Sequence, residues 1–125
     1  MRGRVLVVDD NLDMVETMTT LLRLERYDAK GCVFATEAMH YVREFDPHVV
    51  LLDIRMPGRS GWDIAEEIHR AFPRKRPMLI GISGERLTGG QERLPEAKGL
   101  DYFLLKPIDT KALFALIAKA MVPDC

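Results

Sequence analysis

Short runs of consecutive apolar residues alternate along the chain with longer stretches in which apolar residues recur at helical spacing. Four runs are clear and a fifth is weaker. The clear ones are "RVLVV" (Arg4–Val8), "HVVLL" (His48–Leu52), "PMLIGI" (Pro77–Ile82) and "DYFLL" (Asp101–Leu105), and the weaker one is "DAKGCV" (Asp28–Val33). Continuous apolar character, unlike strict alternation, is typical of strands that are covered on both faces, as in parallel sheets. The pattern therefore predicts five buried strands.

The stretches between and after these runs predict helices, with apolar residues three and four positions apart. Their expected bounds are Leu12–Glu25, Glu37–Phe45, Gly61–Phe72 and Thr110–Met121. Thr36, Ser60 and Asp109 are the expected N-caps of the last three, because short polar side chains can accept hydrogen bonds from free helical N–H groups. Ser60 also precedes Asp63 by three residues, the spacing of a capping box.

A further helix is expected in "GERLTGGQERLPEAKG", but the residues of this segment disfavour a long helix. Gly89 and Gly90 each cost about 1 kcal/mol relative to alanine in a helix. Pro95 is tolerated only near a helix start. We expect a short helix from near Pro95 or one turn earlier, with a loose loop before it.

The order of elements is strand then helix, five times over. Such alternation predicts an α/β fold: a doubly wound, five-stranded parallel sheet with right-handed crossovers and helices on both faces. We expect one domain that covers residues 1–125. In such sheets the working site lies outside the carboxyl ends of the strands, where the strand order reverses.

Composition narrows the class of protein. The 125 residues are 47% hydrophobic and 30% charged, which is typical of a soluble globular domain. The net charge of −1 gives no reason to expect direct nucleic-acid binding. Neither a signal peptide nor a membrane helix is expected, and the two cysteines, Cys32 and Cys125, form no motif. We therefore expect a cytoplasmic protein without direct membrane contact.

Four of the predicted strands are each followed by a charged or hydroxyl side chain, and two of these are followed in turn by a glycine or a proline. These residues are Asp9 and Asp10 after the first, Asp53 after the third, Ser83 and Gly84 after the fourth, and Lys106 and Pro107 after the fifth. Because the carboxyl ends of parallel strands meet at one edge of a sheet, we expect these residues to lie together.

Three converging carboxylates repel one another and work against stability unless a cation offsets them. An all-oxygen site with few protein ligands suits Mg²⁺, which keeps several waters and is completed by phosphate. Lys106 can act as a point charge on a phosphoryl oxygen, Ser83 offers a hydroxyl, and Gly84 lets a backbone N–H approach a ligand. The set predicts phosphoryl transfer with a carboxylate nucleophile. No nucleotide-binding glycine motif is present, so the donor is expected to be a small molecule or another protein.

Each residue also has a plainer interpretation when it is taken alone. Asp9 and Asp10 could simply cap the first helix. Ser83 could be an ordinary loop serine and Lys106 a solvated surface charge. Trp62 is expected to be a packing residue near the site. The common register of these residues at four strand ends favours the functional interpretation.

Four segments resemble the receiver domain of the response regulators of two-component signalling. They are "VLVVDD", "VVLLDIRMPGRSG", "GISG" and "YFLLKPID", in that order, and the resemblance covers essentially the whole chain. It implies a flavodoxin-like (βα)5 fold with strand order 2-1-3-4-5. It further implies a phospho-accepting signalling switch that catalyses only its own phosphorylation and dephosphorylation and is not otherwise an enzyme.

The resemblance assigns roles at the acidic edge. Asp53 resembles the phospho-acceptor, which also contacts Mg²⁺. Asp10 resembles the direct metal ligand, and Asp9 resembles the acid that acts through metal-bound water. The backbone carbonyl of Arg55 matches the third metal contact. Arg55 and Glu85 occupy variable positions of the family, and we hypothesise that they pair over the phosphate entrance.

The resemblance also assigns the parts that respond to phosphorylation. Ser83 is similar to the switch hydroxyl, Lys106 to the phosphate-binding lysine, and Pro107 to a proline that follows a cis bond. Phe103 stands where the family places its switch aromatic, usually a tyrosine, so a hydroxyl contact with a partner is absent. The face expected to change comprises the fourth helix, the fifth strand and the last helix.

Partners follow from the same resemblance: a sensor histidine kinase or a histidine phosphotransfer protein as donor, with a homodimer through the changing face left open. Two rival functions remain. One is a binding module of the same fold that signals without phosphorylation, which the intact Asp, Lys and Ser set disfavours. The other is a phosphohydrolase with an aspartyl-phosphate intermediate, which would need a second acid and a substrate cap that the chain does not supply.

Overall fold

The computed structural model describes residues 2–84 and 99–121, and its centre is a five-stranded parallel sheet. The strands are β1 (Arg4–Val8), β2 (Asp28–Cys32), β3 (Val49–Asp53), β4 (Met78–Ser83) and β5 (Tyr102–Leu105). Their order is β2-β1-β3-β4-β5, and every neighbouring pair is parallel. The predicted fold class and strand order are confirmed, and each strand lies within one residue of its expected bounds.

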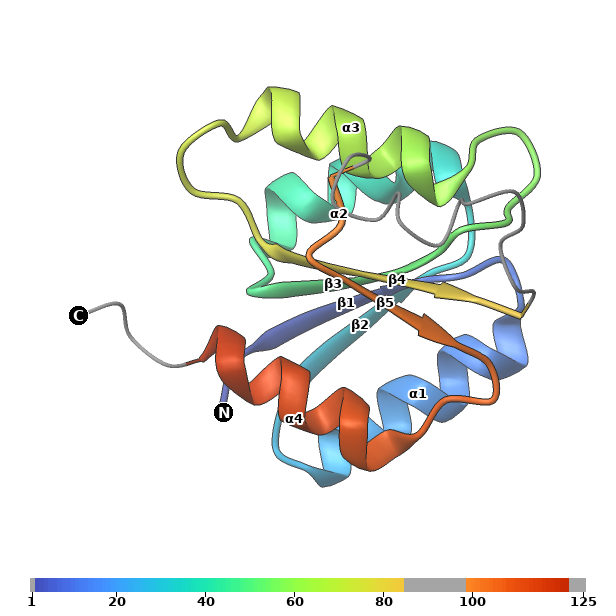
Figure 1. Ribbon diagram of the computed structural model, residues 1–125, viewed down its shortest axis with the longest axis vertical. Helices are drawn as coiled ribbons and strands as arrows, with labels where there is room; N and C mark the ends of the chain where they lie inside the picture. Colours follow the sequence, from blue (N-terminus) through green and yellow to red (C-terminus); the bar gives the residue numbers. More distant parts are fainter. Residues whose placement is uncertain (1, 85–98, 122–125) are drawn as a thin grey trace.

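Helices cover both faces of this sheet. They are α1 (Leu12–Leu24), the short 3₁₀ helix η1 (Ala35–Glu37), α2 (Ala38–Phe45), α3 (Gly61–Ala71) and α4 (Thr110–Ala120). In Figure 1, α2 and α3 lie on one side of the sheet and α1 and α4 on the other. No helix of the described ranges is both long and apolar enough to cross a membrane.

Two cores form because successive side chains of a strand point to opposite faces. Leu6 and Val50 pack with α2 and α3 on one face, whereas Val7 and Leu51 pack with α1 and α4 on the other. All five residues of β3 are buried, as expected for the central strand of a doubly wound sheet. This double coverage explains the unbroken apolar runs of the sequence.

Polar side chains start three of the helices, and two of these caps match the sequence. Ser60 and Asp63 form a complete capping box on α3, and the Asp109 carboxylate accepts hydrogen bonds from two N–H groups of α4. The expectation that Thr36 caps the second helix is wrong. Residues Ala35–Glu37 turn as η1, so Thr36 lies inside that turn and α2 begins at Ala38 without a side-chain cap.

The doubtful helix predicted near Pro95 lies outside the described residues, and so does Glu85, the expected partner of Arg55. The described chain resumes at Gly99, just before β5. The arrowheads in Figure 1 mark the carboxyl edge of the sheet, opposite the end at which β1 begins and α4 ends. Strand order reverses between β1 and β3, so the polar residues that follow these two strands lie where such sheets place their ligands.

Candidate functional site

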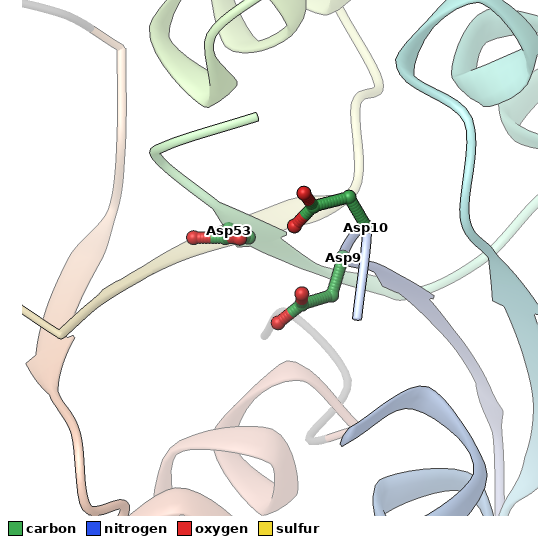
Figure 2. Close-up of side chains that lie close together, drawn as sticks. All are labelled: Asp9, Asp10 and Asp53. Carbon is green, nitrogen blue, oxygen red and sulfur yellow. The ribbon is translucent and has the colours of Figure 1, made fainter. Parts of the chain in front are cut away.

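Three aspartates come together at the carboxyl edge of β1 and β3. Asp53 is the last residue of β3, and Asp9 and Asp10 directly follow β1. The parallel register pairs Val8 with Leu52. The residues that follow them, Asp9 and Asp53, therefore lie side by side. Figure 2 shows the three carboxylates at these adjoining strand ends, and one oxygen from each lies within 4.8 Å of the others.

The three carboxylates differ in exposure. Asp9 is 3% exposed and Asp53 is 6% exposed, whereas Asp10 is exposed to solvent. Backbone N–H groups hold the two buried ones: Asn11 donates to Asp9 Oδ1 at 2.9 Å, and Arg55 donates to Asp53 Oδ1 at 3.2 Å. Two acceptors are therefore fixed in place while the third faces the solvent.

Asp53 is the acid whose ionisation this environment opposes most clearly. Burial and the nearby charge of Asp9 raise its pKa to about 6 from 3.8, although Lys106 and the Arg55 N–H favour the charged form. A carboxyl group with a raised pKa beside a like charge marks a site that is short of positive charge. A bound cation would relieve this deficit.

Lys106 brings one positive charge to the cluster. Its Nζ lies 3.4 Å from Asp9 Oδ2, and its backbone N–H donates to the Ser83 carbonyl at 2.8 Å, which extends the pairing of β4 and β5. Ser83 is the last residue of β4 and is 1% exposed. The Lys106–Pro107 peptide bond is cis, in agreement with the expectation for Pro107.

The remaining residues predicted for the site lie around its rim. Gly84 is exposed, and among the described residues a Cβ added there would meet only Lys106 Cδ, at the ordinary contact distance of 3.7 Å. Phe103, in β5, is half-buried and stacks on Trp62, with ring centroids 6.3 Å apart and planes 2° apart. Trp62 is therefore a packing residue near the site, as predicted.

Two contributors to the site had no assigned role in the sequence interpretation. Asn11 caps α1 with its side chain and fixes Asp9 with its N–H, so neither Asp9 nor Asp10 is the cap. Gly61 begins α3 against the end of β3, where an added Cβ would lie 2.6 Å from the Asp53 carbonyl oxygen. The spacing "MPGxxG" after Asp53 was the available signal for Gly61.

The donor set fits a hard divalent cation. Carboxylate oxygens from three residues converge within 4.8 Å, and no softer ligand belongs to this group of described residues. Mg²⁺ prefers oxygen ligands and retains water, which an open site with one exposed carboxylate permits. Asp9, Asp10 and Asp53 are the residues that could hold it.

A parallel sheet in the order β2-β1-β3-β4-β5 defines the flavodoxin-like class of α/β proteins, which binds its ligands at the carboxyl edge, where this chain places its aspartates. The family model "Response regulator receiver domain" matches residues 5–118. This chain belongs to the response regulator receiver domain family.

Curated relatives and solved structures agree with this assignment. The chain is 32% identical over 121 residues to the DNA-binding response regulator MtrA of Mycobacterium tuberculosis (strain ATCC 25618 / H37Rv), covering 94% of this chain and 50% of the relative. It thus spans about half the length of the curated relatives it matches. A receiver domain protein from Methanospirillum hungatei JF-1 superimposes with a TM-score of 0.83 at 22% identity, covering 94% and 92% of the two chains, which reflects the fold alone. TrrA from Thermotoga maritima, solved in complex with Mg(2+)-BeF, gives 0.79 at 26% identity, covering 94% and 97%.

Proposed function

We propose that this receiver domain is a phosphorylation-driven switch in which Asp53 accepts a phosphoryl group with the help of Mg²⁺. The observation that carries the proposal is the meeting of Asp9, Asp10 and Asp53 at one sheet edge, with Lys106 beside them. We further propose that the receiver domain comprises residues 1–125 and that the only reactions it catalyses are its own phosphorylation and dephosphorylation.

The acceptor step needs Asp53 ionised and aimed outward. An Asp53 oxygen attacks the phosphorus of a phosphohistidine on the partner, the P–N bond breaks, and its electron pair leaves with the imidazole nitrogen. The Arg55 N–H holds the other oxygen, Oδ1, so the attacking group is oriented. Mg²⁺, held by Asp9, Asp10, Asp53 and the Arg55 carbonyl, would supply the positive charge that this acidic site lacks and offset charge on the phosphoryl oxygens.

Lys106 and Ser83 then hold the phosphoryl group. Lys106 Nζ lies 3.4 Å from Asp9 Oδ2, at the edge where a phosphoryl group on Asp53 would sit, and its positive charge would pair with a phosphoryl oxygen. The buried Ser83 hydroxyl ends the neighbouring strand, and the Gly84 N–H follows it. These contacts exist only in the phosphorylated state, which is the difference that a population shift requires.

The readout lies on β5 and α4, together with the segment before β5. Phe103 moves with the hydroxyl and lysine of the site, and its stacking partner Trp62 lies at the start of α3. The proposed phosphoryl donor is a sensor histidine kinase or a histidine phosphotransfer protein. A second copy of the chain can bind the face that changes on phosphorylation. The proposed location of the protein is the cytoplasm. MtrA is described as DNA-binding, but the match covers half of it, so we assign no DNA contact to this chain.

Beryllium fluoride tests the site without a kinase, because it binds a carboxylate oxygen as a mimic of the phosphoryl group. The protein is titrated with Mg²⁺ and beryllium fluoride while Trp62 fluorescence and fluorine NMR are recorded. We expect a bound fluoride signal that requires Mg²⁺ and is absent in Asp53→Asn. The control Glu44→Gln changes an exposed acid of α2 and should bind as wild type. Equal binding by Asp53→Asn would reject Asp53 as the acceptor.

A further inference from the structure

A second hollow lies at the opposite edge of the sheet, among the amino ends of the strands. Its volume is about 830 Å³, within the range of small-ligand sites. The turn between α2 and β3, the turn between α3 and β4, and the last residues of α4 form its walls. The first residue of β1 and the last residues of α4 lie at this edge, opposite the strand arrowheads in Figure 1, so the hollow is separate from the aspartate cluster. We call it the basic groove.

The charge of the basic groove differs from that of the whole chain. Five basic side chains and two acidic ones line it, whereas the net charge of the chain is −1. The basic ones are Arg4, Arg74, Lys75, Arg76 and Lys119, and the acidic ones are Asp46 and Asp101. A hollow that concentrates one sign of charge raises the local concentration of ligands of the other sign.

Both acids of the groove are already paired. Arg4 Nη2 lies 3.5 Å from Asp46 Oδ2, and Arg76 forms a two-pronged pair with Asp101 at 2.7 and 2.9 Å. Arg74, Lys75 and Lys119 have no ion-pair partner within the described ranges, and all three are exposed. Lys119 Nζ lies over the Tyr102 ring, 5.6 Å from its centroid. The excess positive charge therefore faces the solvent.

His48 adds a neutral hydrogen-bond donor. Its Nδ1 accepts the Arg4 backbone N–H at 3.0 Å, so in the neutral ring the proton is on Nε2. Burial and the positive charges of Arg4 and Lys75 lower the pKa of His48, against the opposing effect of Asp46, which favours this neutral form. Nε2–H is thus available to an acceptor atom in the groove.

We propose that the basic groove binds a small organic or inorganic polyphosphate. Such a ligand brings several negative charges into one compact volume, which matches the three cations without an ion pair and the Nε2–H donor. Phe72 and Met78, half-buried in the same lining, offer an apolar surface for an organic part. An acidic peptide fits less well, because the free sheet edges are β2 and β5 while the groove lies at the strand ends, where a peptide cannot add as a strand.

Calorimetric titration of the whole chain in EDTA, at low ionic strength, tests the proposal with three probes: ATP, tripolyphosphate and a hexaglutamate peptide. We expect saturable binding of ATP or tripolyphosphate that weakens with added salt and persists in Asp53→Asn, since the two sites are separate. Equal binding of both phosphates means that the phosphate chain alone is recognised. Tighter binding of ATP means that the groove also contacts the organic part.

Charge-removing variants locate the binding. Arg74→Gln/Lys75→Gln should weaken it at least about tenfold, because two charge-assisted contacts are lost. The matched control is Arg43→Gln/Lys111→Gln, which removes the same charge from exposed positions outside the groove and should bind as wild type. Absence of saturable phosphate binding, an equal loss in the control, or binding of hexaglutamate alone would overturn the proposal.

Discussion

At the scale of single residues, Asp53 is the carboxyl group of the site whose pKa is raised by its surroundings. It is almost completely buried, it adjoins another buried acid, and its pKa lies at about 6 instead of 3.8. Because folding raises this pKa, the contribution of Asp53 to stability is fully present below pH 3.8 and is lost as the pH rises through about 6. The native protein at neutral pH therefore contains a charge that costs free energy until a cation binds.

Replacing Asp53 by asparagine should remove this cost. In EDTA at pH 7.5 we expect Asp53→Asn to have a free energy of unfolding about 1–2 kcal/mol above that of wild type. The difference should shrink as the pH falls below 6 and vanish below pH 3.8, where Asp53 is neutral in both the folded and the unfolded chain. Urea unfolding at pH 7.5 and at these lower pH values measures it. Glu44→Gln, an exposed acid in α2, should show no such pH-dependent gain, and a gain equal to that of Asp53→Asn would contradict this account.

At the scale of elements, the start of α3 sets the environment of the Asp53 backbone. Gly61 donates its N–H to the Ile54 carbonyl at 3.0 Å, and the capping box of Ser60 and Asp63 fixes the first turn. An added Cβ on Gly61 would meet the Asp53 carbonyl oxygen at 2.6 Å, which is backbone and cannot rotate away. A glycine at this position lets α3 approach the backbone of Asp53 closely.

Gly61→Ala should therefore displace α3 from the end of β3. We expect a loss of about 1–3 kcal/mol in the free energy of unfolding, because overpacking forces the backbone to shift. Gly84→Ala is the matched stability control, since within the part of the chain that the structure describes its Cβ would meet only Lys106 Cδ, at 3.7 Å. Urea unfolding of both variants checks this, and equal stability of the two would show that the close approach at Gly61 does not matter.

At the scale of the whole molecule, hydrogen bonds of the Asp101 side chain tie the segment before β5 to β4 and to the segment before β4. Asp101 accepts from both terminal nitrogens of Arg76 and from the Leu79 N–H at 2.8 Å. Burial alone would raise the pKa of Asp101, but these hydrogen bonds and the Arg76 charge outweigh it and leave the pKa below 3.8. This stabilisation is present above pH 3.8 and is lost as the pH falls through the lower folded value.

Asp101→Asn should remove the ion pair with Arg76 but keep one hydrogen bond, because an amide oxygen can still accept from the Leu79 N–H. We expect a loss of about 1–3 kcal/mol in unfolding free energy at pH 7, with the gap to wild type closing below about pH 4. Urea unfolding across this pH range measures both effects. Breaking the exposed pair of Arg70 and Glu66 with Glu66→Gln should cost less than about 0.5 kcal/mol. A similar loss in both variants would contradict the special role of Asp101.

Much of this architecture could be read from the sequence because burial leaves a local mark. The apolar run of β3 is unbroken since both faces are covered, and Asp53 at its end is then placed by the sheet. Thr36 was misassigned because a cap depends on the path of the preceding chain, which turns as η1. Gly61 is marked by the "MPGxxG" spacing, but the spacing does not give the reason for the glycine, which is the close approach of α3 to the Asp53 carbonyl oxygen.

The central claim, that Asp53 accepts a phosphoryl group, is tested most directly by the intact mass of the protein after incubation with acetyl phosphate and Mg²⁺. We predict an adduct of about 80 Da, the mass of one phosphoryl group, on wild type. We predict none on Asp53→Asn and none on wild type in excess EDTA. An adduct of the same yield on Asp53→Asn, or no adduct on wild type with Mg²⁺, would contradict the account.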